Sequence, residues 1–173
     1  MLVLRSSLFI KHGRFLEALA VIDDVLRRDQ EYTAAWQLKI IVLLRLDRMQ
    51  EARAALVSAD ATAAEGDNDH VAAAVNFITG DYESAARFAR RWTTQMSTKV
   101  RADPWGGSVA LTLIAAEARA GNMEHAKAAF EDFHAAVPAV RTVVQVKAWL
   151  IPTSPVPNNE AFFEALKLAG FAN

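Results

Sequence analysis

The sequence predicts an all-α protein built from stacked helical hairpins, and three observations support this prediction. Alanine supplies 34 of the 173 residues and the first proline occurs at position 104, which is a helical composition. Apolar residues recur with helical spacing along most of the chain. A short turn signal recurs four times between these segments, as in repeat proteins. At this length the chain is expected to form one domain with a sizeable core.

Composition and charge exclude several classes of protein. The chain has no cysteine, so it can hold no disulfide framework, thiolate zinc site or cysteine nucleophile. A formal net charge of −1 removes the usual electrostatic argument for a nucleic-acid or membrane-surface binder. The N-terminal segment lacks the order of a signal peptide, and no stretch approaches the roughly 20 apolar residues that span a bilayer. We therefore expect a cytoplasmic protein that binds neither nucleic acid nor membranes.

The repeat signal consists of a turn residue, an apolar residue two positions later and an alanine five positions later. The turn residues lie 34, 33 and 41 positions apart, and the alanines keep the same spacing. The agreement of two separate positions argues against chance. The turn residues are Gly13, Asp47, Gly80 and Gly121, and the alanines are Ala18, Ala52, Ala85 and Ala126.

The chemistry of this signal explains why each copy joins two helices. Glycine adopts the left-handed conformation that ends a helix, and a polar residue then begins the next one. The apolar residue fills the space between the two helices. The alanine is small because the helices cross closely at that point. A single pair of this kind cannot bury its apolar faces, so the pairs are expected to stack.

The expected elements follow in order along the chain. Four helix pairs are predicted, at 2–11 with 15–28, 32–45 with 48–64, 68–78 with 82–98, and 105–119 with 123–136. They define four units, at 1–32, 33–65, 66–103 and 104–138. The remaining segment, 139–173, is expected to contain a helix at 140–150, a proline-rich link and a last helix at 159–169.

The repeat resembles the tetratricopeptide repeat (TPR) family, whose unit has 34 residues. With the turn residue at the fifteenth position, Trp36 falls at the family's fourth position, Phe9 at its eleventh, Phe130 at its twenty-fourth and Pro138 at its closing proline. The family's glycine at the eighth position is absent. The resemblance implies a right-handed α–α superhelix of about four hairpins, completed by a C-terminal hairpin or capping helix. The alternative is a non-repetitive helical bundle.

Two segments depart from a regular repeat. The third interval between turn residues exceeds the family period by seven residues, which we assign to a longer helix and a loop at 93–105. Such an insertion is either a loop without a role or a partner contact. At the C-terminus, Asn158 or Asn159 can cap the last helix and Gly170 can end it. Its apolar stripe is expected to cover the open end of the stack.

The two termini bear on partners. Residues 164–171, Glu-Ala-Leu-Lys-Leu-Ala-Gly-Phe, are similar to the extreme C-terminus of bacterial TPR regions that follow class III adenylate/guanylate cyclase or winged-helix transcription-regulator domains. This resemblance implies a regulatory or sensory role in signalling as the alternative to a stand-alone scaffold. The apolar N-terminal edge is expected to stack on an upstream domain or on a second copy of the chain, unless it packs only on the second helix.

Patterns that would carry chemistry are weak. Glu131-x-x-His134 and Asp67-x-x-His70 have the spacing of di-iron carboxylate helices, but alanines and leucines replace the further carboxylates that such a site needs. The 103–107 loop either presents amides to an anion or simply joins two helices. We therefore expect no catalytic residue, no cofactor and no metal. A basic patch, which is a solvated face or a contact for an acidic partner, comprises Arg87, Arg90, Arg91, Lys99 and Arg101.

The TPR resemblance implies that the first helix of each pair lines a concave groove. Lys11, Arg45 and Arg119 share the thirteenth position and are expected to form a broken basic row beside an apolar floor. Such a groove suits an extended or helical peptide with an acidic edge. The Lys and Asn of the family's chaperone-binding clamp are absent, so chaperone tails are not expected. The predicted groove residues are Lys11, Gln37, Ile41, Leu44, Arg45, His70, Ala74, Phe77, Leu111, Ala115 and Arg119. The sequence thus predicts a non-enzymatic protein–protein interaction module.

Overall fold

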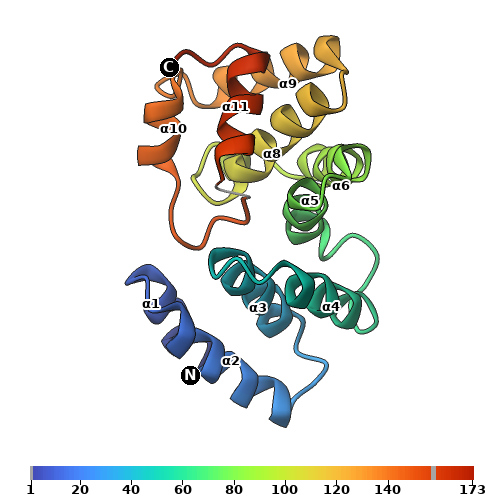
Figure 1. Cartoon of the computed structure of the whole chain (residues 1–173), viewed down its shortest axis with the longest axis vertical. Coiled ribbons are helices and arrows are strands. Elements are labelled where there is room, and N and C mark those ends of the chain that lie inside the picture. The colour runs from blue at the N-terminus through green and yellow to red at the C-terminus, as the bar shows by residue number, and fades with distance from the viewer. Residues whose placement is uncertain (1, 157–158) are drawn as a thin grey trace.

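The structure of the protein, a computed structural model, describes residues 2–156 and 159–173. Within these residues the regular elements are helices, and the only extended pairing is an isolated parallel bridge between Thr142 and Ala172. Antiparallel helix pairs follow one another along a curved stack, as Figure 1 shows. The predicted all-α class and the α–α superhelix are therefore confirmed.

The four predicted pairs are all present. The first half contains α1 (Leu2–Lys11) with α2 (Phe15–Arg28), and α3 (Thr33–Arg45) with α4 (Met49–Asp60). The second half contains α5 (Asp69–Ile78) with α6 (Tyr82–Gln95), and α8 (Gly106–Arg119) with α9 (Met123–Ala136). The remaining helices are α7 (Thr98–Arg101), α10 (Val143–Trp149) and α11 (Glu160–Ala169).

The turn residues have the conformation that their chemistry predicts. Gly13, Gly80 and Gly121 have φ of 70°, 85° and 83°, and Asp47 adopts the same left-handed region with φ of 59°. In each turn the next residue donates its backbone N–H to a carbonyl five residues earlier, as in Arg14 N to Phe9 O at 2.8 Å and Asn122 N to Glu117 O at 2.9 Å. The four signal alanines are completely buried. One local motif therefore closes all four hairpins.

The insertion forms a short helix. α6 ends at Gln95, and Ser97 then caps α7 by accepting a hydrogen bond from Val100 N. α7 packs against α8 and α9. A Cβ at Gly106 would lie 2.1 Å from Val100 O, so the start of α8 approaches α7 too closely for any side chain. The helix expected at 82–98 therefore ends three residues early, and α7 lies in the segment that is predicted to be a loop.

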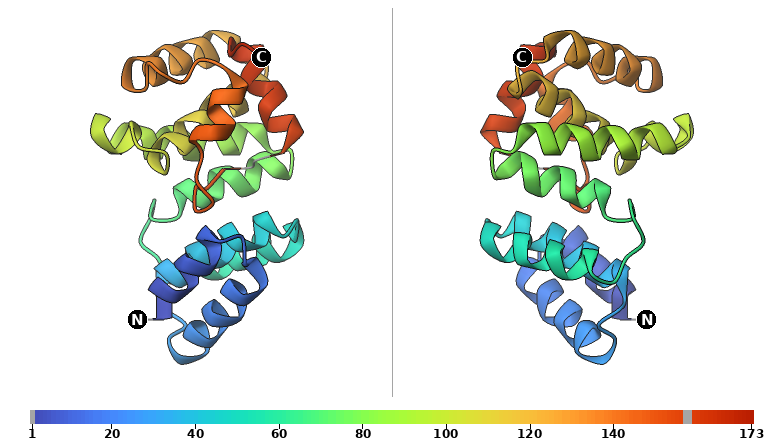
Figure 2. Two further views of the ribbon diagram at one scale, coloured as in Figure 1. Left: turned by 90° about the vertical axis from the view of Figure 1, so that its left-hand side faces the viewer. Right: turned by 90° about the vertical axis from the view of Figure 1, so that its right-hand side faces the viewer.

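Two large hydrophobic cores share α5, which also contributes Ala73 to a small third cluster with Ala89, Trp92 and Val109. One core comprises the buried faces of α1 to α4 together with Val71, Ala74 and Val75 of α5. The other comprises α8 to α11 together with Phe77 of α5 and two alanines of α6. Residues 61–68 connect the halves without helix, because α4 ends at Asp60 and not at the predicted 64. Figure 2 shows this connection at one side of the molecule.

The C-terminal helices leave the regular stack. α11 packs chiefly on α8 and makes smaller contacts with α9 and α10. Asn159 Oδ1 accepts a hydrogen bond from Phe162 N at 2.9 Å, which caps α11, whereas Asn158 lies outside the described residues. Gly170, at φ of 122°, ends the helix. α11 thereby covers the last regular pair from the side of α8.

Candidate protein-interaction surface

The first helices of the four pairs form one face of the stack, here called the first-helix face (α1, α3, α5 and α8; Figure 1). Most of the predicted groove residues on this face are buried. Lys11 and Arg119 are exposed, and Gln37 and Arg45 are half-buried. The buried ones are Ile41, Leu44, His70, Ala74, Phe77, Leu111 and Ala115. The chain therefore does not present the predicted set as one open groove.

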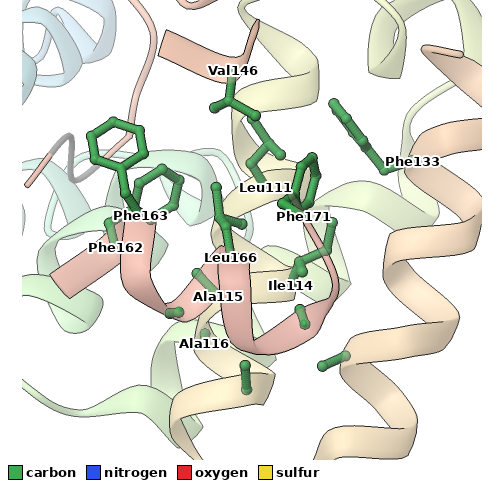
Figure 3. Close-up of a cluster of buried hydrophobic side chains, with 14 of the residues drawn as sticks. Leu111, Ile114, Ala115, Ala116, Phe133, Val146, Phe162, Phe163, Leu166 and Phe171 are labelled. Carbon is green, nitrogen blue, oxygen red and sulfur yellow. The ribbon is translucent and has the colours of Figure 1, made fainter. Parts of the chain in front are cut away.

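α11 covers the first-helix face over α5 and α8. The rings of Phe77 and Phe162 meet edge to face, with centroids 5.8 Å apart. Leu111 and Ala115 are completely buried in the core that contains Phe163 and Leu166 of α11 (Figure 3). The apolar floor that was predicted for a peptide is thus filled by the chain's own last helix.

Residues 150–156, here called the link segment, lie against α3. Arg45 donates from Nε to Pro152 O at 3.3 Å and from Nη2 to Ser154 O at 3.1 Å. Burial lowers the pKa of Arg45 below its ordinary value. In Figure 1 the chain between α10 and α11 descends toward α3. A cation of the first-helix face therefore holds the turn at residues 151–154 through main-chain carbonyl oxygens.

A second anchor fixes the link segment near α8. Ser154 is buried, and its hydroxyl donates to Pro104 O at 3.0 Å and accepts from Ile151 N at 3.2 Å. Val156 is buried in the same core as α8 and α11. The link segment thus runs from α3 in the first half to the start of α8 in the second half.

The predicted basic row is divided by this segment. Arg119 lies over the Tyr82 ring at 5.1 Å and donates to its hydroxyl oxygen at 3.2 Å. Arg45 is engaged by the link segment, whereas Lys11 makes no ion pair with any residue that the structure describes. Lys11, Arg45 and Arg119 consequently have three different environments.

Gln37 and the 61–68 connection form a polar contact between the halves. Gln37 donates to Asp67 O at 3.1 Å and to Asn68 Oδ1 at 3.2 Å. Asn68 in turn donates to Asp60 Oδ1 at 3.0 Å. These hydrogen bonds fix the start of α5 relative to α3 and α4.

Two arginines of the predicted basic patch, Arg90 and Arg91, are paired with carboxylates of the chain, whereas Arg87, Lys99 and Arg101 have no ion pair among the described residues. Arg91 donates to both carboxylate oxygens of buried Asp69, at 2.5 and 2.6 Å, and to Glu65 at 2.9 Å. Its hydrogen bonds to Asp69 raise the pKa of Arg91. Arg90 pairs with Glu117, which is 1% exposed on α8. Arg90 joins α6 to α8 of the next unit, whereas Arg91 joins α6 to α5 within its own unit, so neither belongs to a free cationic face.

His70 lies at the start of α5 in an aromatic environment. Its ring centroid is 5.1 Å from that of Trp105 and 6.5 Å from that of Trp92. Within the described part of the chain neither ring nitrogen has a hydrogen-bond partner. Burial lowers the pKa of His70 to about 4, which keeps the ring neutral near pH 7. The side chain is part of the core and is not available to a peptide.

The weak chemical patterns gain no support from the geometry. Among the described residues no group of three or more histidines and carboxylates is placed to hold a metal ion. His134 packs on the Phe130 ring at 4.1 Å, while Glu131 is exposed. The amides of Trp105 and Gly106 are occupied by the Asp103 carboxylate, at 2.8 and 2.9 Å. The 103–107 loop is therefore closed on its own side chain.

In the described residues no helix combines the length and the apolar character that crossing a bilayer requires.

Comparison with known proteins supports the fold. No family model matches the chain, and no curated protein matches it in sequence. Among solved structures it is similar to YrrB, described as a TPR protein with an unusual peptide-binding site, with a TM-score of 0.62 and 16% identity. The match covers 97% of this chain and 82% of YrrB. The chain therefore has a TPR-like fold.

Sequence reasoning did not find the link segment as an occupant of the first-helix face. Arg45 was placed in the groove, but nothing local in the sequence pairs it with Pro152 and Ser154. One signal in the sequence could have indicated it. Phe162 and Phe163 are adjacent, so the apolar face of α11 is wider than that of an ordinary surface helix, and a wider apolar face needs more covering partners.

Proposed function

We propose that the protein is a non-enzymatic interaction module that binds a segment of a partner polypeptide on the α1 side of its first-helix face. One observation supports this proposal above the others: Arg45 already holds the link segment there by its carbonyl oxygens, at 3.1 and 3.3 Å. Lys11 occupies the equivalent repeat position on α1, is exposed, and lies beside the same segment. Lys11 therefore offers a partner segment a second cation on the same face.

The rest of the first-helix face is a poor alternative. α11 fills it over α5 and α8, and displacement of α11 would expose Phe162, Phe163 and Leu166, which are nearly or completely buried. Loss of that burial would cost several kcal/mol. Partner binding is therefore expected without release of α11, on the surface that α11 leaves uncovered.

A role as the regulatory tail of a bacterial signalling protein remains the alternative proposal. The residues that suggested it include Leu166, Ala169 and Phe171, which are core residues of α11 and its C-terminal turn. Core packing alone explains why these residues are apolar, so the similarity does not favour the regulatory role. We therefore retain a cytoplasmic scaffold as the first proposal.

Selection from a random displayed peptide library against the full chain tests the proposal. Enriched peptides are then titrated into methyl-labelled protein. We expect shifts in the methyl signals of Leu8, Ile151 and Leu44 and none at Val57, which is 72% exposed on α4. Failure to enrich any peptide, or shifts confined to Val57 and its neighbours, would contradict the proposed function.

A further inference from the structure

α1 differs from the other first helices in what its equivalent positions contact. Leu8 lies five residues before the first turn residue, and the same position in the later units holds Val42, Val75 and Ala116. These three side chains are at most 3% exposed, whereas Leu8 is 58% exposed. The later helices α3 and α8 pack on the second helix of the preceding pair, α2 and α6 respectively.

A second position on α1 shows the same difference. Leu4, nine residues before the turn residue, is 72% exposed. Its equivalents Val71 and Thr112 are completely buried, and Leu38 packs against the core of the first half. Leu4 and Leu8 are one helical turn apart and therefore lie on one stripe of α1. The stripe is therefore as apolar as a surface that packs on another helix, but no helix among the described residues covers it.

The stripe borders an open, mostly apolar pocket of about 690 Å³. Leu4, Ser7, Leu8 and Lys11 form its α1 wall, and Ile151, Pro152 and Thr153 of the link segment form the opposite wall. The wall contributed by the link segment carries no charge, so Lys11 is the charged lining residue. The pocket thus combines an apolar interior with a cationic rim.

The charges on α1 decide between possible occupants. Residues 2–16 contain Arg5, Lys11 and Arg14 and no acidic residue. Arg14 is paired with Glu17 at 2.9 Å, and within the part of the chain that the structure describes Lys11 and Arg5 of α1 pair with no carboxylate. A second copy of α1 would bring cations against cations, which opposes self-association. An acidic partner would be attracted to the same surface.

We propose that the α1 stripe and the adjoining pocket bind an amphipathic helix of a partner polypeptide, with an apolar stripe that contacts Leu4 and Leu8 and acidic residues that pair with Lys11. The helical form follows from the equivalent positions in the later units, where this surface of a first helix is covered by other helices of the stack. The acidic character follows from the charge of α1. This inference rests on the proposed function and specifies the chemistry of its partner.

The test uses the full chain and two synthetic helical peptides with leucines on one stripe. One peptide carries glutamates along both flanks of the stripe, and its twin carries lysines at the same positions. Fluorescence anisotropy is expected to show that the acidic peptide binds at least about tenfold more tightly, and that added salt weakens its binding. Equal affinities for the two peptides would overturn the proposal.

Substitutions locate the binding surface. Leu8→Ser is expected to weaken binding of the acidic peptide about tenfold, whereas the control Val57→Ser, at a residue of α4 that is exposed even more, leaves it unchanged. Lys11→Glu is expected to reverse the preference between the twins. Equal losses in Leu8→Ser and Val57→Ser would overturn the proposal. So would a dimer in sedimentation that Leu8→Ser dissociates, because a second copy would then be the occupant.

Failure of this inference is separable from failure of the proposed function. If library-selected peptides bind and shift Leu44 and Ile151 while the acidic helix does not bind, only the inference is wrong. If neither kind of peptide binds, the interaction module itself is contradicted.

Discussion

Arg45 Nη2 donates a hydrogen bond to the main-chain carbonyl oxygen of Ser154 at 3.1 Å, across 109 residues of sequence. Together with the bond from Nε to Pro152 O, it fixes the link segment on α3. Both carbonyls would lose a charged donor if the guanidinium were removed. Hydrogen bonds to charged groups contribute about 1.5–3 kcal/mol each.

The first prediction concerns this contact. Arg45→Ala is expected to speed amide hydrogen exchange in residues 151–156 by tenfold or more, with a loss of global stability of about 1–3 kcal/mol. The matched control is Arg48→Ala, because Arg48 lies near the same helix end and pairs with Glu51 on the surface. Equal exchange in the two variants would show that Arg45 does not hold the link segment.

The second prediction concerns the contact between Phe77 and Phe162. Phe162→Ala removes a completely buried ring and is expected to lower the free energy of unfolding by about 3–5 kcal/mol. Leu168→Ala on the same helix changes a 59% exposed side chain and is expected to cost less than about 1 kcal/mol. Urea unfolding followed by circular dichroism measures both. Similar costs for the two variants would mean that α11 is not docked on α5 and α8.

The third prediction concerns pH. His70 has a pKa of about 4 in the folded chain against an ordinary value of 6.5, so the unfolded state binds a proton first as pH falls. The contribution of His70 to the free energy of unfolding is fully present above pH 6.5. It is lost as pH falls toward 4, by about 3 kcal/mol in total. Carboxylates titrate in the same range, so the measurement is the difference between wild type and His70→Phe.

The phenylalanine variant keeps an aromatic ring beside Trp92 and Trp105 but cannot take up a proton. Its stability is expected to decline less than that of the wild type between pH 6.5 and 4, and the two slopes should agree above pH 7. Parallel curves over the whole range would contradict a buried neutral histidine.

The fourth prediction concerns the ion pair between α5 and α6. Arg91→Gln leaves the Asp69 carboxylate, which is 3% exposed, without its bidentate partner, and is expected to cost about 3 kcal/mol. Arg87→Gln, on the same helix, changes an exposed arginine without a carboxylate partner among the described residues and is expected to be nearly neutral. Thermal unfolding of the two variants distinguishes a structural arginine from a solvated one.

The fold could be predicted because its determinants are local. Each turn residue, from Gly13 to Gly121, acts within its own hairpin, and the alanine five residues later needs only the crossing of two sequential helices. The helix ends at Lys11, Arg28, Arg45 and Arg119 coincide with the predicted ones for the same reason. Interactions between neighbours in sequence leave a readable pattern.

The candidate interaction surface was harder to predict because its shape depends on contacts between distant segments. Phe77, Leu111 and Ala115 have the apolar character of a groove floor and equally that of a core, and only the position of α11 decides between them. Lys11 is exposed because no later segment among the described residues pairs with it. Pattern analysis identifies which residues are apolar, whereas their partners are set by tertiary packing.

The link segment changes how the stack should respond to stress. In an open repeat array each unit contacts only its neighbours, so one end can unfold while the other persists. Here Arg45 of the second unit and Pro104 at the start of the fourth are tied to the same short segment around Ser154. The link segment is therefore a second connection between the halves, in addition to the non-helical residues 61–68. Unfolding of either half would break its contacts with the link segment and destabilise the other half. The chain is therefore expected to unfold in one cooperative transition.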